Sequence, residues 1–165
     1  MNALGFKNPA EAWAIVSIGI AGAVLFAALV LEHWLELTPC PLCLMQRIWV
    51  FFVGAFAFLG LLHNPRFGIY PLLGIGSGLV GGGFSIRQLY LQSLPADQVP
   101  ACGPDITYML EAFPLSDVLA AMTRGTGDCA TVVWQFLGLS IPAWALLGFV
   151  VLIGVSFLQL RAAMR

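Results

Sequence analysis

Four long apolar stretches dominate this sequence and restrict the chain to a membrane. They run from about 12 to 31, 44 to 62, 69 to 91 and 141 to 160. Each is close to the roughly 20 residues that a helix needs to cross a bilayer. Backbone polar groups must be paired within lipid, so a helix is the expected structure for each span. The sequence therefore predicts one membrane domain over 1–165, an all-α integral membrane protein built as a four-helix transmembrane bundle.

The composition agrees with burial in a bilayer. Only 9% of the residues are charged and 60% are hydrophobic, whereas a soluble domain has about 25% charged residues. The net charge of −1 gives no reason to expect a nucleic-acid partner. The first apolar stretch is too long for the core of a secretory signal peptide, and no small-x-small cleavage site follows it. We interpret it as a retained span.

The basic residues predict the orientation of the spans. Lys7, Arg66, Arg161 and Arg165 flank one side of the membrane. The other side holds the loops 32–43 and 92–140, which are mainly acidic, and Arg124 is the one basic residue there that lies clear of a span end. Lys and Arg concentrate in cytoplasmic loops. We therefore expect both termini in the cytoplasm and both loops outside it.

Two features predict how the spans pack. The connection 63–68 is short, so the second and third spans should be antiparallel neighbours. The third span carries Gly74, Gly78 and Gly82 at a spacing of four residues. Such a stripe of small residues lets another helix approach closely, and we interpret it as a packing surface.

The loop 92–140 contains signals for two short helices. Asp105 is placed to cap one helix, and Ser116 is placed to cap a second that ends near Gly125. Their apolar residues recur at helical spacing. Short amphipathic helices beside a membrane lie in the interface or pack on top of the bundle, and the sequence leaves both arrangements open. The predicted fold thus includes short interfacial helices in this loop.

All four cysteines fall on the predicted outer side of the membrane. Cys40 and Cys43 form a Cys-x-x-Cys pair, while Cys102 and Cys129 lie in the second loop. Disulfides persist outside the cytoplasm. Cys43 directly precedes the second apolar stretch, where a helix N-terminus would stabilise a thiolate. Arg47 follows one turn later, about 6 Å along the axis, and would favour ionised Cys43 and attract a negatively charged organic acceptor; snorkelling to the lipid head groups is the alternative.

Three kinds of cysteine site compete at this point. A zinc site is disfavoured because Cys102 and Cys129 are 27 residues apart and neither belongs to a second Cys-x-x-Cys pair, so no metal is expected. Permanent structural disulfides remain open. Redox exchange is favoured over them because static bridges need neither a helix start that stabilises a thiolate nor an arginine inside the membrane edge.

Several motifs together resemble a known family. They are Pro39-Cys40-Pro41-Leu42-Cys43, Gln46-Arg47, Arg87-Gln88-Leu89-Tyr90-Leu91-Gln92, Ala101-Cys102-Gly103, Gly127-Asp128-Cys129-Ala130 and the run from Trp134 to Pro142. In this order and spacing they resemble the disulfide bond formation protein B (DsbB) family, and the resemblance covers nearly the whole chain. A vitamin K epoxide reductase-like protein is a weaker alternative, because Cys-Pro-Leu-Cys opens the second span here.

The resemblance implies a thiol oxidoreductase of the bacterial inner membrane with periplasmic cysteines. Such a protein takes electrons from a DsbA-type periplasmic thiol oxidase and passes them to a membrane quinone, ubiquinone or menaquinone; the DsbA–DsbB–quinone system is known to keep the bacterial periplasm oxidising. By resemblance, DsbA attacks Cys102, Cys129 is its partner, Cys40 exchanges with that pair, and Cys43 meets the quinone beside Arg47.

One residue departs from the family pattern. A histidine often follows the arginine that matches Arg87, and here Gln88 takes that place. An amide can donate a hydrogen bond to a quinone oxygen but cannot titrate. The sequence therefore predicts Gln88 as a quinone-binding residue without a role in proton transfer.

Overall fold

The computed structural model describes residues 8–64, 66–104 and 106–165. Its long helices are α1 (Pro9–His33), α2 (Pro41–His63), α3 (Ile69–Ser93) and α6 (Ile141–Ala163). All four are long and apolar enough to cross a membrane, since 23 residues rise about 35 Å against a hydrocarbon core of about 30 Å. The prediction of an all-α, four-helix membrane bundle is confirmed.

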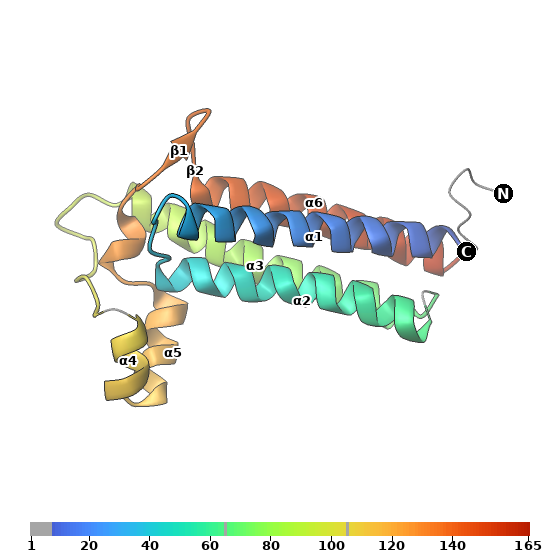
Figure 1. Ribbon diagram of the computed structural model, residues 1–165, viewed down its shortest axis with the longest axis horizontal. Coiled ribbons are helices and arrows are strands. Elements are labelled where there is room, and N and C mark those ends of the chain that lie inside the picture. The colour runs from blue at the N-terminus through green and yellow to red at the C-terminus, as the bar shows by residue number, and fades with distance from the viewer. Residues whose placement is uncertain (1–7, 65, 105) are drawn as a thin grey trace.

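The four long helices lie side by side along the longest axis of the molecule (Figure 1). α1 and α3 each pack against both α2 and α6. The core between them consists of Ala21, Val50, Val53, Phe149 and Leu152. Large apolar side chains also cover the outside; Phe26 is 69% exposed and Leu62 68%. An apolar exterior of this extent fits contact with lipid rather than water.

Glycines allow α3 to lie close against α6. A Cβ atom on Gly78 would be 2.6 Å from Ile153 Cγ1, and one on Gly74 would be 3.1 Å from Ser156 Oγ. At Gly81, a neighbour of the predicted stripe, the clash with the Phe149 ring would be at 2.2 Å. Gly78 and Gly81 have no room for a side chain, and a side chain on Gly74 would force Ser156 to shift, so the small residues on α3 serve packing.

Helix α2 begins earlier than its apolar stretch. Pro41 stands at its first position, where a missing N–H costs nothing and the fixed φ suits a helix. Cys40 is therefore the N-cap residue, and Cys43 lies inside the first turn. The prediction that Cys43 precedes the span was wrong in this respect, because hydropathy alone did not register the proline start.

The segment between α3 and α6 holds short elements at the cysteine end of the bundle, the end where α2 and α6 begin. They are α4 (Ile106–Ala112), α5 (Leu115–Arg124), the 3₁₀ turn η1 (Gly127–Ala130) and the strands β1 (Gln135–Phe136) and β2 (Leu139–Ser140). Asp105, expected to cap the first short helix, lies outside the described residues. Ser116 does not cap the second, because Pro114 holds that place and the helix begins at Leu115.

Gly125 ends α5 as predicted and fixes it to the bundle. Its φ of +80° suits glycine. A Cβ there would be 2.7 Å from Leu42 Cδ1 and 2.8 Å from Leu91 Cδ1. The chain therefore passes directly over the first turn of α2 and the last turns of α3, and η1 follows at once. This contact brings Cys129 to the Cys-x-x-Cys pair.

Candidate active site

The start of α2 holds the Cys-x-x-Cys pair. Cys40 has extended backbone as the N-cap residue, and Cys43 is the third residue of the helix. The two sulfur atoms lie 2.8 Å apart. A disulfide needs about 2.05 Å, so small side-chain movements interconvert a dithiol and a disulfide at this position. Both side chains line a cavity at this end of the bundle.

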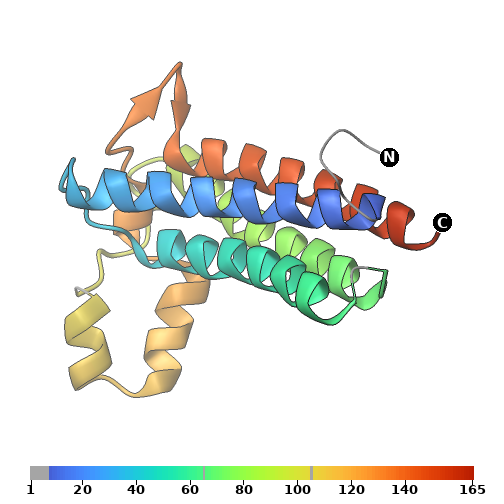
Figure 2. The same cartoon turned by 45° about the vertical axis from the view of Figure 1, so that its right-hand side comes forward.

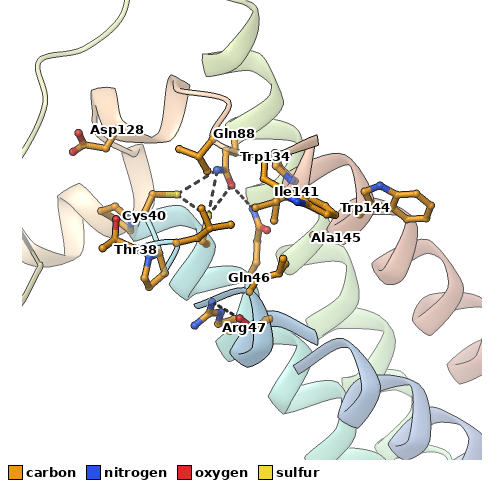
Figure 3. Close-up of a pocket in the computed structure, with 18 of the residues that line it drawn as sticks. Thr38, Cys40, Gln46, Arg47, Gln88, Asp128, Trp134, Ile141, Trp144 and Ala145 are labelled. Carbon is orange, nitrogen blue, oxygen red and sulfur yellow. Dashed lines mark hydrogen bonds between the residues drawn. The ribbon is translucent and has the colours of Figure 1, made fainter. Parts of the chain in front are cut away.

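A buried pair of amides holds these sulfurs in place (Figure 3). Gln88 on α3 donates from Nε2 to Cys40 Sγ at 3.2 Å and to Cys43 Sγ at 3.3 Å. Gln46 on α2 donates to Gln88 Oε1 at 2.8 Å, which aims the Gln88 NH₂ group at the sulfurs. Both glutamines are buried. Donation to two sulfurs stabilises negative charge on either one.

Gln88 thus has a contact that the sequence did not predict. It was expected to meet the quinone, and the structure places its donor on the cysteines. Gln46 was overlooked as a functional residue. Its spacing of three from Cys43 on a helix was a usable signal, because residues three apart lie on one face.

Arg47 is held by helix α1. Its Nη1 pairs with the Glu32 carboxylate, and its Nη2 donates to the Ala28 carbonyl oxygen at 3.1 Å. The Arg47 and Glu32 side chains are 23% and 31% exposed. The guanidinium therefore lies across the α1–α2 interface, beside the cavity, instead of extending freely to the head groups. Glu32 was not predicted, because nothing in the sequence places it opposite Arg47.

Cys129 joins the second cysteine pair to the first. It lies in η1, is fully buried, and packs with Leu42, Leu91 and Cys40. A hydrogen bond between the two cysteine side chains lowers the pKa of Cys129 to about 6. The same contact raises the pKa of Cys40 above the ordinary thiol value. Of the two, Cys129 is the thiolate at neutral pH.

Cys102 lies on irregular backbone and is exposed. Its loop is fastened to η1: the Gly127 N–H donates to Ala101 O at 3.1 Å, and a Cβ on Gly127 would be 3.1 Å from Cys102 Sγ. The neighbouring Asp128 carboxylate raises the pKa of Cys102 by hydrogen bonding and by charge. Cys102 therefore remains a thiol where Cys129 ionises.

The cavity beside the first pair has a volume of about 760 Å³, within the usual range for small-molecule sites. Figure 3 shows Gln46, Gln88 and Arg47 on its wall, with Trp134, Ile141 and Trp144 along the side toward α6. Its lining is mostly apolar, and Arg47 and Asp128 are its charged members. In the described part of the chain, no cluster of three or more His, Cys, Asp or Glu side chains is arranged to hold a metal.

Every site residue predicted from the sequence is thus found at one end of the bundle, in two connected parts. Cys40, Cys43, Gln88 and Arg47 surround the cavity, whereas Cys102 and Cys129 lie in the loop above it. Cys40 belongs to both parts because it lines the cavity and touches Cys129. The arrangement can pass electrons from an exposed sulfur to a sulfur that faces an organic pocket, while the disulfide moves in the opposite direction.

Comparisons with known proteins agree with this arrangement. The family model described as disulfide bond formation protein DsbB matches residues 9–159. The chain is 48% identical over 148 residues to disulfide bond formation protein B of Saccharophagus degradans, covering 88% of this chain and 89% of that protein. It is 52% identical over 136 residues to the protein of the same name from Hahella chejuensis, covering 81% and 82%. Its cysteine geometry and these matches together place the chain in the disulfide bond formation protein B family.

Proposed function

We propose that this protein is a quinone-linked thiol–disulfide oxidoreductase. It reoxidises a DsbA-type thiol oxidase and passes the electrons to a membrane quinone, ubiquinone or menaquinone. The observation that carries this proposal is the double contact of Cys40. On one side it touches buried Cys129, and on the other it shares the cavity with Cys43 and Arg47.

Exposure and ionisation give the first exchange a direction. In the oxidised protein the disulfides are Cys102–Cys129 and Cys40–Cys43. A thiolate of the partner reaches Cys102 because that sulfur is exposed while Cys129 is buried. A partner–Cys102 bond forms, the Cys102–Cys129 bond breaks, and Cys129 leaves as a thiolate. Its pKa of about 6 makes it a good leaving group.

The second exchange occurs at Cys40. The Cys129 thiolate attacks Cys40 Sγ, so a Cys40–Cys129 bond forms and Cys43 is released. The second thiol of the partner then closes the partner's own disulfide and releases Cys102. Cys102 attacks Cys129 and restores the first bridge, which leaves Cys40 and Cys43 reduced. This pair closes again by losing two electrons and two protons.

The cavity has the properties that a quinone site needs. A bound quinone supplies the terminal acceptor, because its reduction takes up two electrons and two protons. Arg47 would hold a ring oxygen through its guanidinium, while Gln88 keeps Cys43 oriented and stabilises its charge. Apolar side chains of α1, Val24 and Leu25 among them, line the same cavity and suit an apolar tail.

The charge distribution supports a bacterial inner-membrane location. Arg66 follows α2, while Arg161 and Arg165 stand at the end of α6, so all three lie at the end of the bundle opposite the cysteines. The positive-inside rule then puts both termini in the cytoplasm and all four cysteines in the periplasm. A periplasmic position would also bring Cys102 to a soluble thiol oxidase and keep the cysteines in an oxidising compartment.

A direct assay tests the proposal. Purified protein is mixed with a reduced DsbA-type oxidase, with and without a quinone, and the quinone absorbance is followed together with the partner's thiol content. We expect one quinone reduced for each partner disulfide formed. Permanent structural bridges would instead leave the quinone oxidised, and thiol trapping would show no covalent complex with the partner.

A further inference from the structure

The β1–β2 hairpin extends sideways from the cysteine end of the bundle. Gln135 pairs with Ser140 and Phe136 with Leu139, and Leu137 and Gly138 form the turn. In both Figure 1 and Figure 2 the hairpin projects away from the long helices, on the side opposite α4 and α5. It therefore points along the plane of the membrane surface.

The turn contains a strained and exposed leucine. Leu137 has a φ of +51° and Gly138 a φ of +78°. Two-residue turns with positive φ at both positions favour Asn-Gly, because a larger side chain is sterically disfavoured there. Leu137 is nevertheless 78% exposed. A side chain this exposed gains little from packing within the protein, so a benefit that offsets the strain would come from outside the chain.

The surface around the turn is apolar and uncharged. No Asp, Glu, Lys or Arg occurs from Cys129 to Leu160. Val133 is 62% exposed and Phe136 52%. A two-stranded hairpin is marginally stable in water, and an exposed apolar surface indicates an interaction site. The short helices on the opposite side differ, because α5 carries both Asp117 and Arg124.

The base of the hairpin forms part of the cavity wall. Trp134 stacks on Phe136 with ring centroids 5.9 Å apart, and Trp144 donates from Nε1 to Phe136 O at 3.1 Å. Both tryptophans line the cavity, as does Val133. A displacement of the hairpin tip would therefore be transmitted directly to the wall beside the Cys-x-x-Cys pair.

We infer that the β1–β2 hairpin is a membrane anchor whose tip, Leu137, is buried in the lipid interface and holds the mouth of the cavity at the depth of a lipid-borne substrate. The hairpin surface is continuous with the lipid-facing side of α6, where Leu147 and Val151 are about half exposed. Aromatic residues next to uncharged apolar ones are typical of the membrane interface. A soluble partner has its target elsewhere, at exposed Cys102.

Leu137→Asn tests the inference in the full-length protein, because asparagine suits positive φ and the turn should fold at least as well. The protein is placed in phosphatidylcholine vesicles with a phospholipid that carries a diazirine near its head group, and lipid adducts are mapped by mass spectrometry. We expect adducts at 136–139 in the unmodified protein. In the variant they should fall by about tenfold, the factor for withdrawing one leucine from lipid.

Leu62→Asn is the matched control, since Leu62 is an exposed leucine at the other end of the bundle; it should leave the hairpin adducts unchanged. A kinetic comparison, which rests on the proposed function, adds a second readout. Leu137→Asn should raise KM for a long-chain quinone in vesicles, with kcat and KM for a short, water-soluble quinone unchanged.

Absence of hairpin adducts in the unmodified protein would overturn the inference. A raised KM for the thiol oxidase, with lipid labelling unchanged, would also overturn it and assign the hairpin to protein docking. If the unmodified protein reduced no quinone, the proposed function would fail, while the lipid labelling would still decide whether the hairpin is an anchor.

Discussion

The two cysteine-bearing regions differ in how firmly their sulfurs are held. Cys40 and Cys43 lie on the first turn of a long helix, and two buried glutamines fix their positions. Cys102 lies on exposed backbone without regular structure, fastened mainly through Gly127. A sulfur that must meet a macromolecule needs access, whereas one that transfers electrons into a pocket needs fixed geometry. In the function proposed above, these two tasks are divided between the two cysteine-bearing regions.

Removing the exposed sulfur of Cys102 should have the largest effect on this division of tasks between the two cysteine pairs. Cys102→Ser should abolish oxidation of the DsbA-type partner, because Cys129, the other cysteine of that pair, is buried. Reduction of the Cys40–Cys43 pair by a small dithiol, with quinone as acceptor, should continue at close to the normal rate. Quinone absorbance measures both reactions on one preparation. Normal oxidation of the partner by this variant would show that the loops do not act in series.

Arg47→Ala should weaken the pocket without affecting the exposed loop. Losing a charged hydrogen bond of about 1.5–3 kcal/mol should raise KM for quinone by roughly tenfold to a hundredfold, with KM for the partner unchanged. The ion pair to Glu32 is partly exposed, so its loss should cost little stability. Thermal unfolding in detergent serves as the control. Normal quinone kinetics with a lower Tm would make Arg47 an anchor of α1 only.

Gln88→Leu should slow turnover to a smaller extent. The leucine keeps the side-chain bulk but cannot donate to either sulfur, and one net hydrogen bond is worth about 1 kcal/mol, or roughly fivefold. The effect should appear in kcat. Gln46→Leu should give a weaker effect of the same kind, since Gln46 acts through Gln88. If only KM for quinone changed in Gln88→Leu, the result would instead support direct contact between Gln88 and the quinone, as predicted from the sequence.

The sequence was sufficient for the parts of the fold that depend on local pattern. Apolar length indicated the four helices, and the spacing of Gly74 and Gly78 indicated close packing, which α6 satisfies. The β1–β2 hairpin was missed because Leu137-Gly138 lacks the asparagine or aspartate that marks such turns. Two-residue strands also leave too little alternation for a strand pattern to be recognised.

In the candidate site, too, local motifs could be predicted from the sequence and long-range contacts could not. The four cysteines and Arg47 could be chosen from motifs, because their chemistry is visible in the residue type. Contacts between distant segments could not: Glu32 meets Arg47 from another helix, and Gln88 reaches back to Cys40. Which amide faces a sulfur and which faces the pocket depends on helix rotation and crossing, and no pattern along one chain segment contains that information.

Cys102 and Cys129 should ionise at different pH values in protein that is reduced at all four cysteines. Because the pKa of Cys129 is about 6, its reaction with a small thiol reagent should stay constant down to neutral pH and fall as pH drops through 6. The pKa of Cys102 is raised by Asp128, so the midpoint of its reaction with pH should lie above that of an ordinary thiol. Asp128→Asn removes that negative charge and keeps an acceptor for Thr126, which now donates to the carboxylate at 3.2 Å. The Cys102 midpoint should therefore move down in pH while the Cys129 midpoint stays in place.

Mass spectrometry resolves the two sites in one sample. Equal midpoints in the unmodified protein would remove the ionisation difference that sets the direction of exchange.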